Sequence, residues 1–401
     1  MSAKSTEVLV IGGGYAGVMA ANRLTRRDDV TVTLVNPRPQ FVERIRLHQL
    51  VAGTHDAALD YGKVLSGRVR LLVDTVTGID AAGRSVTLAS GGTAGYDYLV
   101  YAVGSGSAGP SVPGAAEFAH PLATFEEARR LRPALDAAPA KAPVTVVGGG
   151  TTGIETAAEL AAEGRTVTLV CGGTLGPSLH PRGRRAVARR LAALGVTVLE
   201  GPDAKVTAVT RDAVHLADGR ELPSEVTVWT AGFGVPDLAA RSGLSTDALG
   251  RLLTDETLTS VDDERIIAAG DSAAPSDLPL RMSCQAAVQL GPQAAETVLS
   301  RIAGERPAPI DVAFVAQCLS LGRRAGLLQL TEKDDTARKY HLGGRPGAKV
   351  KELICKGIPW QLSYEARKPG ARTWWSKDPK RQELLAARRA AGTPVAAAQT
   401  V

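Results

Sequence analysis

Residues 7–24, EVLVIGGGYAGVMAANRL, decide the class of fold. A short apolar run leads into a Gly-x-Gly-x-x-Gly turn made by Gly12, Gly14 and Gly17, and an alanine-rich segment of helical character follows. The first glycine of such a turn allows the tight bend, the second lets a pyrophosphate approach the backbone, and the third lets the helix pack closely on the strand. A strand expected at Val30–Val35 completes a strand-helix-strand unit, so this stretch predicts a dinucleotide site.

The same pattern returns at residues 143–162, PVTVVGGGTTGIETAAELAA, with Gly148, Gly150 and Gly153 in the turn. The returning strand is expected at Arg165–Val170. One glycine turn alone is a weak signal, because tight turns also occur in α/β sheets that bind no ligand. Two turns of the same spacing, each between a strand and a helix and 136 residues apart, predict two dinucleotide sites.

Three further apolar runs end in glycine. Tyr96–Ser105 and Val226–Gly234 both read as strands that end in small residues, and Ile266–Asp271 reads as a buried strand. The last run presents the Asp271 carboxylate directly after Gly270, where it can accept hydrogen bonds from ligand hydroxyls. Capping of the following helix is the alternative role for this side chain.

From Glu7 to Asp271, the order of these features resembles that of the flavoprotein superfamily of pyridine nucleotide-disulfide oxidoreductases. The resemblance implies an α/β fold with two Rossmann-like dinucleotide-binding domains, the NAD(P)H domain being inserted into the FAD domain, plus a smaller C-terminal domain. The expected boundaries are 1–114 and 246–310 for the FAD-binding domain, 115–245 for the NAD(P)H-binding domain, and 311–401 for a C-terminal domain at the acceptor site.

The resemblance also assigns the cofactor contacts. The first glycine turn would bind the FAD pyrophosphate, the second the nicotinamide dinucleotide, and the Gly-Asp pair the ribityl or phosphate region of the flavin. The residues expected to bind the two cofactors are Gly12, Gly14, Tyr15, Ala16, Gly17, Asn36, Arg44, Ala102, Gly104, Gly148, Gly150, Thr152, Gly153, Cys171, Gly232, Gly270 and Asp271.

Two of these positions depart from the family pattern, which has an acid at the end of the second strand of each unit. Asn36 replaces the acid that binds the FAD ribose, and its amide can still bond to hydroxyls. Cys171 replaces the acid that would favour NADH and repel a 2′-phosphate. NADH is expected, but NADPH stays open because Arg182, Arg184 and Arg185 follow; an exposed helix face is their alternative role.

The cysteines and one glutamine pair narrow the branch of the superfamily. The four cysteines form no CxxC or CxxxxC pair, which argues against a dithiol enzyme, a disulfide framework and a metal site. Residues 284–291, CQAAVQLG, are similar to the Gln-x-Ala-x-Gln-x-Gly signature of type II NADH:quinone oxidoreductases, in which the two glutamines flank the quinone. Gln285 and Gln289, four apart, share a helix face, and a solvated face is the alternative.

The same branch implies a charged pair. Glu155 follows Gly153 as in the family's Gly-x-Glu, which would place it beside the nicotinamide and the flavin. Lys351 is the candidate partner of Glu155, and the alternative is one more lysine in a basic region. Glu155, Gln285, Gln289 and Lys351 are therefore the expected catalytic residues, with Glu155 orienting the nicotinamide or moving protons.

The expected activity is an FAD-dependent NAD(P)H dehydrogenase that passes hydride to the flavin and then two electrons to a quinone-like acceptor. One alternative acceptor is a ferredoxin-like protein or a specialised metabolite. A second alternative is a redox sensor that binds FAD and NAD(P)H with little turnover. Glu43, Arg46 and His48, with Arg44, follow the first unit and are candidates for the border of the acceptor pocket, none of them assigned a catalytic role.

Composition sets the remaining expectations. The chain has 401 residues, of which 44% are apolar and 22% charged, as in soluble globular proteins of two or three domains. The sequence holds no membrane-spanning window and no secretory signal, so a cytoplasmic protein is expected. Residues 333–401 hold 15 Lys and Arg against 6 Asp and Glu. This basic region contains three of the four tryptophans, Trp360, Trp374 and Trp375, and such a combination suits peripheral contact with an anionic membrane surface. The alternative roles for these tryptophans are packing over the flavin and a homodimer interface. Nucleic-acid binding is not expected.

Overall fold

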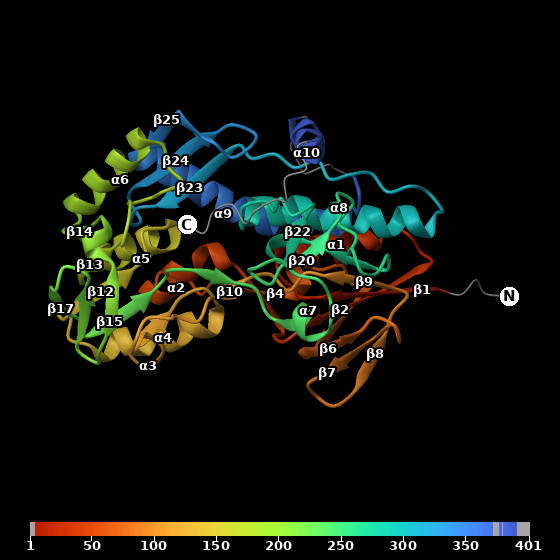
Figure 1. Cartoon of the computed structure of the whole chain (residues 1–401), viewed down its shortest axis with the longest axis horizontal. Helices are drawn as coiled ribbons and strands as arrows, with labels where there is room; N and C mark the ends of the chain where they lie inside the picture. Colours follow the sequence, from red (N-terminus) through yellow and green to blue (C-terminus); the bar gives the residue numbers. More distant parts are fainter. Residues whose placement is uncertain (1–4, 372–376, 379, 391–401) are drawn as a thin grey trace.

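The computed structural model describes residues 5–371, 377–378 and 380–390, and two parallel sheets organise them (Figure 1). The first sheet has the order β21-β9-β1-β2-β5, with every neighbouring pair parallel. Its strands are β1 (Thr6–Ile11), β2 (Val30–Asn36), β5 (Val69–Val73), β9 (Tyr98–Tyr101) and β21 (Ile266–Ala268).

The second sheet repeats this architecture with the order β11-β18-β12-β13-β14, again all parallel. Its strands are β11 (Ala119–Pro121), β12 (Pro143–Val147), β13 (Thr166–Val170), β14 (Thr197–Leu199) and β18 (Val226–Trp229). Three helices accompany this sheet: α4 (Phe125–Ala137), α5 (Thr151–Ala162) and α6 (Pro181–Ala193). Both strand-helix-strand units expected from the glycine turns are present, which confirms the α/β class with two Rossmann-like units.

Each parallel sheet carries a small antiparallel sheet inserted before its return strand. The first is β6 (Val76–Asp80), β7 (Ser85–Leu88) and β8 (Thr93–Gly95), and the second is β15 (Val206–Val209), β16 (Ala213–Leu216) and β17 (Glu221–Pro223). Short strands make three further pairs, β3 (Gln40–Val42) with β4 (Ala58–Asp60), β10 (Gly106–Ser107) with β19 (Phe233–Gly234), and β20 (Leu252–Thr254) with β22 (Ala273–Pro275). The β10–β19 pair joins the two segments through which the chain leaves and re-enters the first unit.

The chain returns to the first sheet earlier than residue 246. In helix α7 (Leu238–Arg241), Leu238 packs in the same core as Tyr101 of β9, and so does Leu244 after the helix. Residues 238–244 therefore pack with the first sheet, although they fall within the range 115–245 expected for the inserted domain.

Helix α1 (Tyr15–Leu24) lies between the first sheet and two long helices, α8 (Cys284–Ile302) and α9 (Gly344–Arg367), so all its residues are buried. Gly291 allows the close crossing, because a Cβ there would lie 2.3 Å from the Ala16 carbonyl oxygen. The C-terminal sheet of β23 (Ala316–Ser320), β24 (Gly326–Thr331) and β25 (Ala337–Gly343) packs on α9. The remaining helical elements are α2 (Leu47–Ala52), α3 (Ala115–Phe118), α10 (Lys380–Ala390) and the 3-10 turns η1 (Arg44–Arg46), η2 (Tyr61–Lys63), η3 (Pro202–Ala204) and η4 (Gly270–Ser272).

Buried charges tie the C-terminal region to the first unit. Arg23 of α1 bonds to Glu365 of α9, and Arg381 of α10 forms a two-bond ion pair with Glu256 at 2.9 Å. Within the part of the chain that the structure describes, no helix is long and apolar enough to cross a membrane. Trp360 lies on α9 with 51% of its surface exposed, whereas Trp374 and Trp375 lie outside the described residues.

Candidate active site

The first glycine turn has the geometry that a bound pyrophosphate requires. Gly12 has a φ of +101°, and a Cβ there would lie 2.3 Å from the Ala102 carbonyl oxygen. A Cβ at Gly17 would lie 1.8 Å from the carbonyl oxygen of Gly12, so helix and strand meet at van der Waals contact. Apart from its own chain neighbours, no described residue has an atom within 4 Å of the Gly14 Cβ position, and Gly14 begins α1 without a side-chain cap. The helix N-terminus is therefore open to an anion.

The second turn repeats this geometry. Gly148 has a φ of +123°, and a Cβ at Gly153 would lie 1.9 Å from the Gly148 carbonyl oxygen. Gly150 has open space at its Cβ position and begins α5 without a side-chain cap. Thr152 lies in the first helical turn, half-buried, and its carbonyl accepts a hydrogen bond from the Thr156 hydroxyl at 2.7 Å. Both sets of backbone N–H groups thus fit a dinucleotide pyrophosphate.

The two residues that replace the family's acids lie against these turns. Asn36 accepts a 2.9 Å hydrogen bond from the Gly13 N–H, and the Tyr61 hydroxyl donates to the Gly13 carbonyl at 2.8 Å. Cys171 lies against Gly149, whose Cβ would be 3.0 Å from the sulfur, and burial raises the pKa of this thiol to about 12. The thiol is therefore neutral at physiological pH and carries no charge that would repel a 2′-phosphate.

Other predicted cofactor-binding residues include glycines whose backbone adopts the left-handed conformation. Gly104 and Gly270 both have positive φ, +71° and +75°, and a Cβ at Gly270 would lie 2.9 Å from the Ala16 Cβ. Gly232 has a φ of +81° and lies in the segment that re-enters the first unit. Tyr15 is buried in α1, and its ring meets Phe41 edge-on at 5.3 Å.

Asp271 is held by three groups from separate parts of the chain. Its carboxylate accepts a 2.7 Å hydrogen bond from the Ser105 hydroxyl and a 3.1 Å bond from the Ser283 N–H. The Arg44 guanidinium lies 3.6 Å from the same carboxylate and donates to Ser105 at 3.0 Å. Sequence reasoning missed Ser105 and Ser283 as members of this cluster. For Ser105 the signal was its place in the turn after Gly104, whereas the Ser283 backbone N–H has no sequence signal.

Glu155 and Lys351 form a buried ion pair at the junction of α5 and α9. The Lys351 Nζ lies 2.8 Å from the Glu155 Oε1, which also accepts a 2.8 Å hydrogen bond from the Ser320 N–H. Burial alone would raise the pKa of Glu155, but Lys351 and His48 lower it overall. Burial opposes the charge on Lys351 as well, and the Glu155 carboxylate nonetheless raises the pKa of the ammonium. Both groups are thus charged together.

His48 completes this cluster. Its Nδ1 lies 3.8 Å from the Glu155 Oε2, and burial lowers its pKa to about 4. Its Nε2 is buried and has no hydrogen-bond partner among the residues that the structure describes. His48 is therefore neutral at physiological pH, with one ring nitrogen unused.

Gln285 and Gln289 lie on one face of α8, as their spacing predicts, and both bind the segment before β23. The Gln289 amide donates to the carbonyls of Gln285 at 2.9 Å and Ala313 at 3.3 Å. The Gln285 amide, oriented to satisfy both of its atoms, donates to the Ala316 carbonyl and accepts from the Val315 N–H, each at 3.0 Å. In this structure the amides thus join α8 to the backbone, and their contact with an acceptor stays a prediction.

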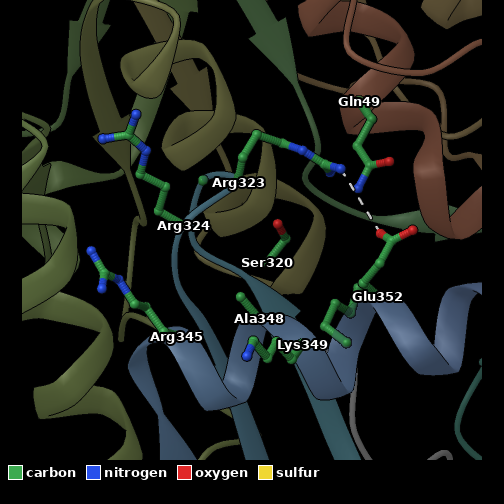
Figure 2. A pocket seen from close by; sticks show the side chains of 10 residues that line it. Gln49, Ser320, Arg323, Arg324, Arg345, Ala348, Lys349 and Glu352 are labelled. Atoms are coloured by element: carbon green, nitrogen blue, oxygen red, sulfur yellow. Dashed lines mark ion pairs between the residues drawn. The ribbon is translucent and has the colours of Figure 1, made fainter.

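A cavity of about 480 Å³ opens beside the Glu155–Lys351 ion pair (Figure 2). Its wall combines the β23–β24 turn, the first turns of α9 and one residue of α2; the lining residues are Gln49, Ser320, Gly322, Arg323, Arg324, Arg345, Ala348, Lys349, Lys351 and Glu352. It contains none of the glycine-turn residues and none of the residues of α8.

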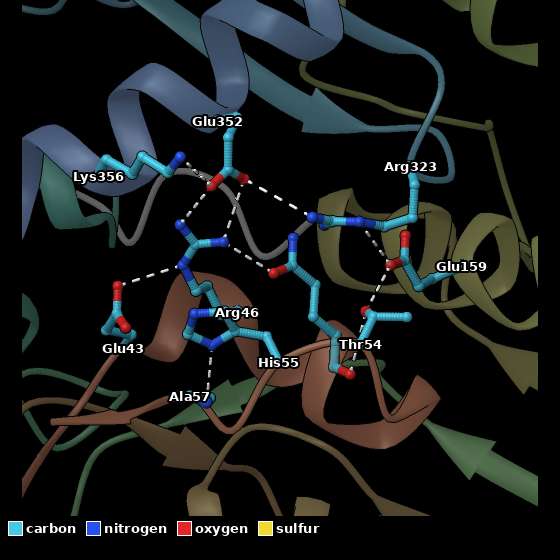
Figure 3. A network of polar contacts seen from close by, with 10 residues as sticks. Glu43, Arg46, Thr54, His55, Ala57, Glu159, Arg323, Glu352 and Lys356 are labelled. Carbon is cyan, nitrogen blue, oxygen red and sulfur yellow. Dashed lines mark hydrogen bonds and ion pairs between the residues drawn. The ribbon is translucent and has the colours of Figure 1, made fainter.

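A charged network borders the cavity and joins four elements (Figure 3). Arg46 bonds to Glu43 at 3.2 Å and to Glu352 of α9 at 3.1 Å. Arg323 lies between Glu352 and the buried Glu159 of α5, at 3.9 Å and 3.8 Å. Burial raises the pKa of Glu159, which lies one helical turn after Glu155. Through Arg46, Glu43 is thus linked to Glu352, which follows Lys351 on α9, whereas His48 contacts Glu155. The network links the two parallel-sheet units to α9.

This site and fold define the class of protein. The chain belongs to the pyridine nucleotide-disulphide oxidoreductase family, whose model matches residues 6–294. This membership indicates a nucleotide-binding oxidoreductase that uses FAD and NAD(P)H, in agreement with the two open glycine turns.

Known proteins place the chain more closely. An NADH dehydrogenase-like protein of Mycobacterium tuberculosis is 32% identical over 381 residues, which cover 87% of this chain and 93% of that protein. A type II NADH:quinone oxidoreductase of the same organism is 28% identical over 346 residues, which cover 75% of this chain and 74% of that protein. The sulfide:quinone oxidoreductase of Aquifex aeolicus shares the fold, with a TM-score of 0.77, 20% identity, and coverage of 91% and 93% of the two chains.

Proposed function

We propose that this protein is an NAD(P)H dehydrogenase that reduces a quinone-like acceptor through FAD. The observation that carries the proposal is the buried ion pair of Glu155 and Lys351, whose charged atoms lie 2.8 Å apart. Glu155 lies one helical turn after the second glycine turn. The names of two relatives, an NADH dehydrogenase-like protein and a type II NADH:quinone oxidoreductase, support the same activity.

The glycine turns would hold the two cofactors in this proposal. The backbone N–H groups after Gly14 would bind the FAD pyrophosphate, and those after Gly150 would bind that of the nicotinamide dinucleotide. Asp271, fixed by Ser105 and the Ser283 N–H, would accept hydrogen bonds from flavin hydroxyls. FAD, when bound, supplies the hydride acceptance and two-electron transfer, and the protein supplies binding and orientation.

Glu155 would orient the nicotinamide, and Lys351 would hold the Glu155 carboxylate in place. The Lys351 ammonium and the Ser320 N–H both bind the Glu155 Oε1 in a buried setting, so a single rotamer of the carboxylate is favoured. Neutral His48 next to Glu155 offers a proton-accepting nitrogen, its unpartnered Nε2. We assign Glu155 and Lys351 to positioning and proton balance, with no covalent step.

The acceptor would bind at the N-terminal half of α8. Gln285 and Gln289 share the helix face toward residues 313–316, and an acceptor carbonyl would take one of the amide donors now bound to backbone. For the domains, we propose the division drawn from the sequence, except that residues 238–244 join the FAD unit, with which they pack. The chain crosses between the two units at the β10–β19 pair.

Peripheral contact with a membrane and formation of a homodimer stay predictions. The support for a membrane surface is the exposed Trp360 on α9 and the excess of Lys and Arg after residue 332. Vesicle flotation with anionic and neutral lipids, and sedimentation of the free protein, test the two predictions separately.

The experiment is an anaerobic titration of the purified, FAD-loaded protein with NADH and separately with NADPH, followed by addition of a soluble quinone. We expect bleaching of the flavin spectrum by one nucleotide and prompt recovery with quinone. Variant Q285A/Q289A should retain bleaching and lose recovery by about tenfold or more. Bleaching without recovery in the unchanged protein would refute the quinone acceptor, and a protein that binds no FAD would refute the proposal altogether.

A further inference from the structure

The cavity beside Lys351 lies at the meeting point of two basic segments (Figure 2). Arg323 and Arg324 come from the β23–β24 turn, and Arg345 and Lys349 come from the first turns of α9. Its volume of about 480 Å³ is within the range of small-molecule sites. The hollow could therefore enclose a molecule considerably larger than a single ion.

The charge of this cavity is not balanced by its own wall. The lining holds five cationic side chains and a single carboxylate, that of Glu352. Lys351 is paired with Glu155, and Arg323 shares two carboxylates. The exposed side chains of Arg324, Arg345 and Lys349 take part in none of the ion pairs that the structure shows among residues 5–371, 377–378 and 380–390.

Isolated surface arginines without partners are ordinary, but here several cations gather around one hollow. Two cations from the turn and two from the helix border one hollow, where their fields add and low-dielectric walls concentrate them. Helix α9 also begins at Gly344 without a side-chain cap, which adds the positive end of its dipole at the same place. Phosphate and carboxylate groups are the natural ligands of such arginine clusters.

We propose that this cavity binds a small polyanion, a metabolite with at least two phosphate or carboxylate groups. It is separate from the turn that would bind the dinucleotide pyrophosphate. Gly322 packs on the C-terminal half of α5, where its Cβ would lie 3.0 Å from the Ala162 Cβ, whereas Gly150 precedes the other end of that helix. At about 1.5 Å per residue, the two ends are on the order of 15 Å apart.

The site is nevertheless in contact with the candidate active site. Lys351 and Ser320 line the cavity, and both bind Glu155, each at 2.8 Å. A bound anion would also attract Arg323 away from its long contacts of 3.8 Å and 3.9 Å with Glu159 and Glu352. The polyanion is therefore expected to act as an effector rather than as a substrate.

The test is isothermal titration calorimetry with inorganic pyrophosphate of the FAD-loaded protein in saturating NAD+, which occupies the second glycine turn, in a magnesium-free buffer of low chloride. We expect saturable binding of one pyrophosphate per chain. The variant R324A/R345A should bind at least about tenfold more weakly, because it removes two charge-assisted contacts. K349A should show a smaller loss in the same direction.

A matched control removes two exposed arginines of the inserted unit, R130A/R211A, with the same change in net charge. This control should bind pyrophosphate like the unchanged protein. Equal weakening in both double variants, or no saturable binding at about 10 mM pyrophosphate, would overturn the proposal. Binding of an acidic electron-transfer protein without binding of pyrophosphate would also overturn it. The heat signal does not depend on turnover, so this result and that of the quinone experiment are separate.

Discussion

Replacement of Lys351 by methionine should destabilise the protein strongly, because it leaves the Glu155 carboxylate buried without its cation. At the observed 2.8 Å and an effective dielectric constant of about 20, the attraction between the two charges is about 6 kcal/mol. Desolvation of the ammonium offsets part of this attraction in the intact pair. The variant loses the attraction and keeps the buried carboxylate, so we expect a loss of about 3–5 kcal/mol in the free energy of unfolding.

The assay is urea denaturation at neutral pH, followed by far-ultraviolet circular dichroism, for K351M, E155Q and the double variant E155Q/K351M. Each single variant leaves one uncompensated charge, whereas the double variant leaves none. The stability loss of the double variant should therefore be smaller than the sum of the two single losses by about 2 kcal/mol or more. The control is K356M on the same helix, where an exposed lysine lies 3.8 Å from Glu352 and should contribute less than about 0.5 kcal/mol.

Additive losses in this cycle would contradict the predicted stabilisation, since they would mean that Glu155 and Lys351 do not stabilise each other. A loss below about 1 kcal/mol in K351M would refute it as well, because a buried carboxylate without a cation cannot be that well tolerated.

Three other predictions follow from the structure. Burial of the neutral His48 imidazole lowers its pKa from 6.5 to about 4, so the unfolded chain binds more protons than the folded protein between these pH values. The free energy of unfolding should therefore fall by about 3 kcal/mol from pH 6.5 to pH 4. In thermal melting, the H48N variant should show a smaller fall over the same range. The G17A variant should lose more than about 3 kcal/mol of unfolding free energy in urea denaturation, because its Cβ would lie 1.8 Å from the Gly12 carbonyl oxygen. The G14A variant, by contrast, should keep its stability but retain FAD about tenfold less well, as measured by flavin release. C171D should raise the ratio of kcat/KM for NADH over NADPH by about tenfold, and an unchanged ratio would exclude this position from cofactor selection.

The local sequence pattern was sufficient to predict the strands, turns and helices of the two nucleotide-binding units. Strands, glycine turns and helices formed where the sequence predicted them, with β2 ending one residue later, at Asn36, and β13 beginning one residue later, at Thr166. This success has a local cause, since the left-handed φ of Gly12 and Gly148 and the close packing at Gly17 and Gly153 each need a residue without a Cβ.

Contacts between distant segments were harder to predict. The ion pair of Glu155 with Lys351 joins residues nearly two hundred positions apart, and the lysine had only a weak match to support it. The backbone bonds of Gln285 to residues 315 and 316 could not be predicted, because an amide on a helix face gives no indication of which segment will lie against it. The packing of Leu238 against the core of the first sheet likewise has no local sequence signal.

The two glycine turns, the parallel sheets that they initiate and the family can be read from the amino-acid sequence, because each depends on residues close together in the chain. Tertiary packing sets which charges become buried partners and where the basic residues of the C-terminal region gather. Arg323 and Arg345 are unremarkable as sequence, and they border one cavity only because β23, β24 and α9 fold against α5 and α2. Long-range packing sets the local charge and burial on which the chemistry of such sites depends.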